Sequence, residues 1–139
     1  MKITDLNEDQ VRDVEERLEE YDGRFIREKL TGDIRIGIEE DGRLIAGLDA
    51  SVTAFRILYV STVFVEEAYR RKGIGTALIR EMERRAALMG VDTIRLDTFS
   101  WQGKEFYEAM GYRIVGNYEN SAGGYAEYFF LKRLSPPDD

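Results

Sequence analysis

The first apolar pattern in the chain has the period of an α-helix. Residues 6–21 are mostly charged, and Val11, Val14 and Leu18 are spaced so that they fall on one narrow face. Asn7, with a glutamine three residues later, has the sequence of a capping box, which marks the start of a helix. We therefore expect the chain to begin with an amphipathic helix.

A two-residue period follows this helix. Residues 33–40 carry isoleucine at alternate positions, which is typical of a strand. Asp41-Gly42 is a two-residue hairpin turn sequence, so residues 43–52 are expected to return beside the first strand. Residues 55–65 form the longest apolar, β-branched and aromatic run, which predicts a central strand buried on both faces.

The second half of the chain alternates between helix and strand patterns. The expected elements are a helix over 74–89, a strand over 93–99, a short helix over 102–111, and closing strands over 112–118 and 126–134. A strand, a helix and a strand in succession predict a parallel βαβ crossover. The fold class is therefore α/β (mixed α+β), as one domain over residues 1–139 with a frayed tail over 135–139.

Composition narrows the class of protein. The chain has 43% hydrophobic and 34% charged residues, which is ordinary for a soluble domain, and no run approaches the ~20 apolar residues of a membrane span. The N-terminus has no apolar signal region and cysteine is absent, so we expect a cytoplasmic protein. A net charge of -7 argues against broad binding to nucleic acid and favours a cationic small molecule or peptide amine.

Two missing residue types exclude whole chemistries. Without histidine or cysteine there can be no Ser-His or Cys-His nucleophile, and no metal site is expected. Catalysis must then depend on carboxylates, tyrosine, hydroxyls, lysine or backbone amides.

Positive charge gathers where the 74–89 helix begins. Arg70, Arg71 and Lys72 precede Gly73 and Gly75 at the expected helix start. Helix N-termini bind anions through free N–H groups, and glycine lets a ligand approach the backbone. The turn therefore suits a diphosphate, although a solvated helix start is the simpler alternative. It matches neither the nucleotide P-loop nor the dinucleotide G-x-G-x-x-G pattern.

Residues 63–79 (VFVEEAYRRKGIGTALI) resemble the acyl-CoA-binding segment of the GNAT superfamily of N-acyltransferases. The resemblance continues through residues 96–116 (LDTFSWQGKEFYEAMGYRIVG) and is nearest to a bacterial branch of acetyltransferases. It implies a GNAT-like domain: a central, mixed, mostly antiparallel sheet with one parallel βαβ crossover and flanking helices. It also implies acetyl-CoA as cosubstrate and suggests a homodimer.

The resemblance carries over to individual residues. It places the pantetheine arm along the central strand and the diphosphate over the glycine–arginine turn. The implied cofactor-binding residues are Val63, Phe64, Val65, Arg70, Arg71, Lys72, Gly73, Ile74, Gly75, Thr76 and Ser100. Tyr107 matches the family tyrosine beside the thioester sulfur, where a phenol can protonate the departing thiolate. A core tyrosine is the alternative for Tyr107.

This chain departs from the family pattern at two positions. Ser100 stands where many members have an asparagine that bonds the pantetheine, and Ser61 where many have a glutamate base. Glu66 and Glu67 are expected to be solvated, and Asp97 is a weak candidate that could instead anchor a turn. No general base is named.

Three function classes remain at this point. The leading hypothesis is an N-acetyltransferase that moves acetyl directly from acetyl-CoA to a primary amine of a small molecule or peptide. The second is a catalytically weak acyl-CoA-binding module that acts as a sensor or interaction partner. The third, a nucleotide-binding regulator, shares only the anion-binding turn. No nucleic-acid or membrane partner is expected, and the acceptor amine stays open.

Overall fold

The computed structural model describes residues 1–135, and the element order agrees with the hydrophobic pattern. The expected tail over 135–139 lies almost wholly outside the described residues. The helices are α1 (Glu8–Asp22), α2 (Ile74–Met89) and α3 (Lys104–Ala109), with a short 3-10 turn, η1 (Glu67–Tyr69). The strands are β1 (Asp33–Glu40), β2 (Arg43–Ala54), β3 (Ile57–Val65), β4 (Thr93–Phe99), β5 (Arg113–Asn120) and β6 (Tyr125–Arg133).

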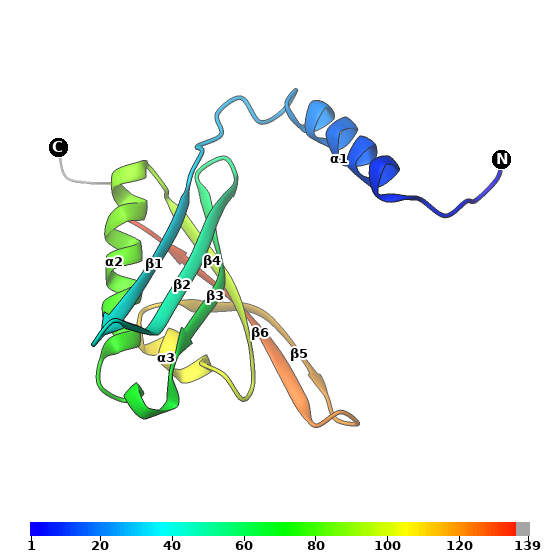
Figure 1. Ribbon diagram of the computed structural model, residues 1–139. Coiled ribbons are helices and arrows are strands. Elements are labelled where there is room, and N and C mark those ends of the chain that lie inside the picture. The colour runs from blue at the N-terminus through cyan, green and yellow to red at the C-terminus, as the bar shows by residue number, and fades with distance from the viewer. Residues whose placement is uncertain (136–139) are drawn as a thin grey trace.

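The strands form one mixed sheet in the order β1-β2-β3-β4-β6-β5 (Figure 1). β3 and β4 pair in parallel and are joined by α2, while the other neighbouring strands pair antiparallel. This confirms the expected sheet and its βαβ crossover.

Local sequence signals set the ends of several elements. The Asn7 side chain accepts from the Gln10 backbone N–H, and the Gln10 side chain accepts in return, so the capping box is present. Asp41 and Gly42 have φ values of 52° and 76°, as a type I′ hairpin turn requires. Gly90 ends α2 at a φ of 96°, in the left-handed conformation that favours glycine.

α2 packs on one face of the sheet, and the core lies between them. Buried residues of α2 contact alternate residues of β1 to β4 and β6, including Leu58, Ile94 and Phe130. The opposite face of β3 carries Tyr59, Thr62 and Phe64, which are partly or fully exposed. The expectation that the central strand is buried on both faces is therefore wrong, because no helix within residues 1–135 covers this second face.

α1 lies apart from the rest of the molecule (Figure 1). No residue of the helix is buried, and its apolar stripe of Val11, Val14, Leu18 and Tyr21 is 43–58% exposed. The amphipathic helix predicted from the sequence has formed, but it contributes nothing to the core of its own chain.

Candidate active site

β3 and β4 diverge halfway along their length. Their parallel pairing ends at Tyr59 and Arg95, although β3 continues to Val65 and β4 to Phe99. A register shift against β2 leaves Ser61 as an extra residue in β3 just beyond this point. The backbone of β3 past the bulge therefore has strand partners on the β2 side alone, and its other edge is free to pair with an extended ligand.

The predicted pantetheine-binding residues lie on this free edge. Val63 and Val65 turn their side chains into the core, whereas Phe64 is 56% exposed on the opposite face. Side-chain packing and backbone binding can therefore coexist here, because only the main chain would pair with the ligand.

The chain then turns sharply into α2. Arg71 has a φ of 62°, an uncommon value for a residue with a Cβ, and Gly73 has a φ of 80°. Backbone outliers of this kind cluster at ligand-binding sites. The first helical hydrogen bond runs from Ala77 N to Gly73 O at 3.0 Å, so the N–H groups of Ile74 to Thr76 have no partner within the helix. Residues 70–76, which we call the 70–76 turn, can therefore bind an anion.

The three cations of this turn have different surroundings. Arg70 donates from Nε to the carbonyl oxygen of Val65 at 2.8 Å and lies over the Phe64 ring, so it ties the turn to β3. Arg71 and Lys72 are exposed, and Lys72 lies over the Tyr69 ring. Arg71 and Lys72 are therefore the cations best placed to meet a ligand, while Arg70 also holds the turn in position.

The two glycines of the turn serve different purposes. A Cβ on Gly73 would meet no atom within 4 Å, so its requirement is the positive φ. A Cβ on Gly75 would lie 3.3 Å from Cζ of Phe106 and 4.0 Å from a methyl group of Val65. Gly75 therefore lets the end of β3, the start of α2 and the start of α3 converge.

Tyr107 comes from α3, next to this point of convergence. Its ring packs against Phe106, Tyr112 and Phe130, and the residue is 8% exposed. Burial raises the pKa of Tyr107 to about 12, so its hydroxyl stays protonated at neutral pH. Within residues 1–135 the Tyr112 hydroxyl alone is both fully buried and unpartnered. The Tyr107 hydroxyl, which makes no hydrogen bond to these residues either, must then retain some access to solvent.

A polar network fixes the turn from β4 into α3. The buried Thr98 hydroxyl donates to Oε1 of Gln102 at 3.2 Å and accepts from Gly103 N at 3.2 Å. Gln102 also accepts from the Phe99 backbone N–H at 2.7 Å. Sequence reasoning missed this network, and the signal that could have found it is a threonine at a core-facing position of β4.

Ser100, predicted to bind the cofactor, is occupied in this turn. Its hydroxyl accepts from the Ala126 N–H at 3.2 Å, and its own N–H donates to the Ala126 carbonyl. Ser100 therefore joins β4 to β6, and its hydroxyl keeps its proton and one lone pair for a ligand.

Of the carboxylates near the divergence, one faces it from β4. Glu66, expected to be solvated, keeps 29% of its side chain exposed and forms a bidentate surface pair with Arg43 at 2.6 and 2.9 Å. Asp97 accepts from the Tyr59 hydroxyl at 2.9 Å on the open face of the sheet. Continuing the β3–β4 register past its last pair places Asp97 level with Ser61, on the other side of the divergence.

The same open face holds a hollow of about 550 Å³ over β1 to β3. Gly37 and Gly47, which pair across β1 and β2, lower its floor. The exposed side chains of Leu44 and Phe64 line it, and Asp49 and Glu66 stand at its edge. It is therefore an apolar hollow over the paired strands β1 to β3, and its two carboxylates are ion-paired, Asp49 with Arg35 and Glu66 with Arg43.

Comparison with known proteins agrees with these features. Residues 2–112 match the model of the acetyltransferase (GNAT) family. The chain is 29% identical over 96 residues to a blasticidin-S acetyltransferase of Streptomyces morookaense, covering 68% of this chain and 70% of that protein. It is 30% identical over 102 residues to the acetyltransferase Atu2258 of Agrobacterium fabrum, covering 73% and 74%.

A solved structure shows the same fold over nearly the whole chain. The crystal structure of an acetyltransferase from Bacillus cereus superposes with a TM-score of 0.90 at 27% identity, covering 96% of this chain and 98% of that one. The fold, the family match and the relatives agree: this chain belongs to the GNAT acetyltransferase family.

Proposed function

We propose that this acetyltransferase moves the acetyl group of acetyl-CoA to a primary amine of a small molecule or peptide, by direct attack within a ternary complex. The observation that carries the proposal is the convergence at Gly75 of the free edge of β3, the 70–76 turn and α3. Homologues in the family bind acetyl-CoA or CoA.

The cofactor's parts correspond to the parts of this site. The N–H groups of Ile74 to Thr76, with Arg71 and Lys72, suit the diphosphate. The pantetheine arm would pair with Val63 to Val65 as an added strand, which leads the thioester toward the bulge at Ser61.

The reaction follows from this placement. A neutral amine attacks the acetyl carbonyl, and backbone N–H groups of β3 stabilise the oxyanion. The carbon–sulfur bond breaks, and Tyr107 gives its proton to the thiolate of CoA. No cysteine is present to carry an acyl-enzyme, which favours direct transfer.

We assign the removal of the amine proton to Asp97. Ser61 cannot act as a base, and Glu66 is held by Arg43, whereas Asp97 faces the divergence from β4. Its bond from the Tyr59 hydroxyl fixes one carboxylate oxygen, and the other can accept a proton directly or through one water.

The hollow over β1 to β3 fits an acceptor whose amine is carried on an apolar body. Leu44 and Phe64 would contact the body. Asp49 and Glu66 also line the hollow, but each is paired with an arginine, Arg35 and Arg43. Blasticidin S belongs in the acceptor panel, since one relative is named for it. The panel also includes a polyamine, an aminoglycoside and a peptide with a free N-terminus.

The test of the cofactor site is the melting temperature with acetyl-CoA. Ligand at ~100 times its Kd should stabilise the protein by about 2.7 kcal/mol, a shift of several degrees for a domain of this size. Arg71→Glu and Gly73→Asp should abolish the shift. Arg80→Glu makes the same charge change on the exposed side of α2 and should retain it. If neither acetyl-CoA nor CoA raises the melting temperature, the proposal is overturned.

The second candidate function is an acyl-CoA-binding module with little turnover. Ser61 in place of the family glutamate and the engaged Ser100 hydroxyl favour it. A melting shift without CoA release across the amine panel would support this alternative.

A further inference from the structure

The Tyr107 hydroxyl depends on the rest of its helix for its position. No residue within 1–135 bonds to this oxygen, so its place is set by the ring contacts and by the backbone of α3. Proton transfer to a thiolate needs a donor within hydrogen-bond reach, and a displacement of about 1 Å can cost ~10²-fold in rate. The residues that fix α3 therefore bear directly on the reaction.

α3 is held on both sides of Tyr107. At its start, Gly103 N donates to the Thr98 hydroxyl at 3.2 Å, and Gly103 O accepts from Tyr107 N at 3.0 Å. At its end, the carbonyl oxygen of Met110 accepts from Nζ of Lys132 at 2.8 Å. The position of Tyr107 therefore depends on one fixed point before it and one after it.

Lys132 is a charged residue on the core side of the sheet. It follows the buried Phe130 by two residues in β6 and is paired with the buried Ile94 of β4, so all three side chains point to the same face. The Lys132 side chain is 26% exposed. A charge in such a place is costly unless it is paired and hydrogen-bonded.

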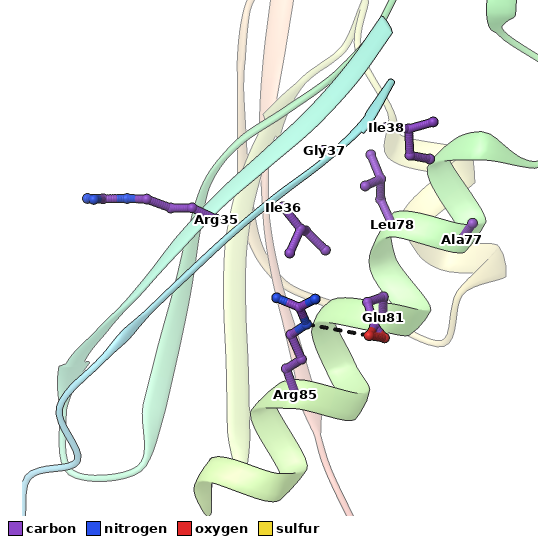
Figure 2. A pocket seen from close by; sticks show the side chains of 8 residues that line it. All are labelled: Arg35, Ile36, Gly37, Ile38, Ala77, Leu78, Glu81 and Arg85. Atoms are coloured by element: carbon purple, nitrogen blue, oxygen red, sulfur yellow. Dashed lines mark hydrogen bonds and ion pairs between the residues drawn. The ribbon is translucent and has the colours of Figure 1, made fainter. Parts of the chain in front are cut away.

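A carboxylate from α2 supplies the ion pair. The oxygens of Glu83 lie 2.8 and 3.2 Å from Nζ of Lys132, and the Glu83 side chain is 14% exposed. Glu81, the other acidic residue of α2, instead bonds within its own helix, to Arg84 and to Arg85 (Figure 2). Glu83 therefore joins α2 to the end of α3 through the lysine of β6.

A second contact runs from Lys132 to the ring beside Tyr107. The ammonium lies 5.3 Å from the ring centroid of Tyr112, and this ring packs against that of Tyr107 with centroids 5.9 Å apart. Tyr112 N also donates to Tyr107 O at 3.0 Å. Lys132 therefore reaches Tyr107 by two routes, through the carbonyl at the end of α3 and through the neighbouring tyrosine.

We infer that Lys132, held by Glu83, is a positioning residue that fixes the Tyr107 hydroxyl for acetyl transfer, and that it affects the reaction through Tyr107 alone. The inference rests on the proposed role of Tyr107 as general acid. Replacing an ion pair of low exposure by apolar residues of similar size often leaves stability unchanged. What apolar residues cannot replace is the directional bond from Lys132 to Met110 O.

The test is the steady-state kinetics of a variant that loses both charges together. Glu83→Met/Lys132→Met leaves no unpaired charge behind, so it should remain folded, which its melting temperature checks. The bond to Met110 O is lost, so kcat should fall ~10-fold. The Kd of acetyl-CoA, from calorimetric titration, should be unchanged, because the 70–76 turn and the edge of β3 do not involve this pair. Glu83→Gln is the milder second variant if the double variant does not fold.

Lys104→Met is the matched control on the same helix. Lys104 also pairs with a glutamate, Glu108 at 3.0 Å, and also lies over a tyrosine ring, that of Tyr128. Within residues 1–135, however, Lys104 makes no bond to the carbonyl at the end of α3. Lys104→Met should therefore keep kcat.

The Tyr107→Phe background separates positioning from a general loosening of the fold. With the hydroxyl gone, Glu83→Met/Lys132→Met, or Glu83→Gln in its place, should lower kcat no further. An equal fall in both backgrounds, or no fall in wild type, overturns the inference and leaves the proposed acetyltransferase activity standing. A Tyr107→Phe protein with the kcat of wild type overturns it in the same way. A wild type that binds acetyl-CoA but acetylates no amine overturns the proposed function and the inference together.

Discussion

Tyr107 combines a packed ring with a hydroxyl that makes no hydrogen bond to any residue within 1–135. Its aromatic contacts with Phe106, Tyr112 and Phe130 do not depend on the oxygen. We therefore expect Tyr107→Phe to keep the melting temperature and the acetyl-CoA affinity while kcat falls by about 10²-fold, the lower range for loss of a general acid. Steady-state kinetics with the best acceptor measure this. An unchanged kcat would make Tyr107 a core residue.

The raised pKa of Tyr107 predicts a pH range over which its hydroxyl does not ionise. Burial favours the neutral phenol and raises its pKa to about 12. Any loss of activity near pH 10 should therefore be the same in wild type and in Tyr107→Phe. Because the folded pKa lies above the unfolded value, the stabilisation is complete below pH ~10 and is lost as pH rises toward 12. Denaturant unfolding of both proteins between pH 9 and 11 checks the sign.

Substitution of Asp97 tests whether this residue is the general base. Asp97→Asn keeps the acceptor for the Tyr59 hydroxyl but cannot take a proton, so kcat should fall while acetyl-CoA binding is unchanged. Asp49→Asn is the matched control, since Asp49 lies on the same face but is paired with Arg35. It should lower kcat far less than Asp97→Asn does. Equal effects of both variants would show that Asp97 acts only through the general charge of the face.

At the scale of elements, the β3–α2–α3 junction depends on two glycines for different reasons. Gly73→Ala should cost about 1–2 kcal/mol from the left-handed conformation alone. Gly75→Ala should destabilise through contact with Phe106. Phe106→Leu should therefore recover stability in the Gly75→Ala background and not in Gly73→Ala. Urea unfolding of the single and double variants measures the coupling, and equal recovery in both backgrounds would contradict the two roles.

The elements also show which features a local sequence pattern can predict. The capping box at Asn7 and the Asp41-Gly42 turn depend on neighbouring residues, and both formed as predicted. The end of α2 at Gly90 likewise depends on a local backbone conformation. The error at β3 has a different origin. Apolar and aromatic residues on both sides of a strand predict that both faces are buried. Whether a helix covers the second face depends on segments far away in the sequence.

At the scale of the molecule, the acidity is not spread evenly. α1 carries eight acidic and two basic residues, which is -6 of the net -7, so the rest of the chain is close to neutral. The negative charge that argues against nucleic-acid binding therefore lies mainly on α1 and not around the candidate active site. Within residues 1–135, no helix is long and apolar enough to cross a membrane.

Local charge at the 70–76 turn predicts a salt effect. Arg71 and Lys72 are exposed, so ions screen their attraction for the cofactor's phosphates. The Kd of acetyl-CoA should rise several-fold between ~20 and ~500 mM NaCl. In Arg71→Gln the rise should be smaller, because one of the screened charges is gone. Calorimetric titration at both salt concentrations measures this, and equal rises in both proteins would remove Arg71 from the diphosphate site.

The sequence by itself determined the order of elements, many of their ends, the glycine–arginine turn before α2 and the family. These depend on hydrophobic period, caps and glycine conformations, which act over a few residues. Only the tertiary structure decided that one face of β3 is open, that Asp97 accepts from Tyr59, that Arg43 pairs with Glu66, and that α1 lies apart from the core. Each of these joins residues far apart in the chain, and nothing in a local pattern states which distant surfaces will meet.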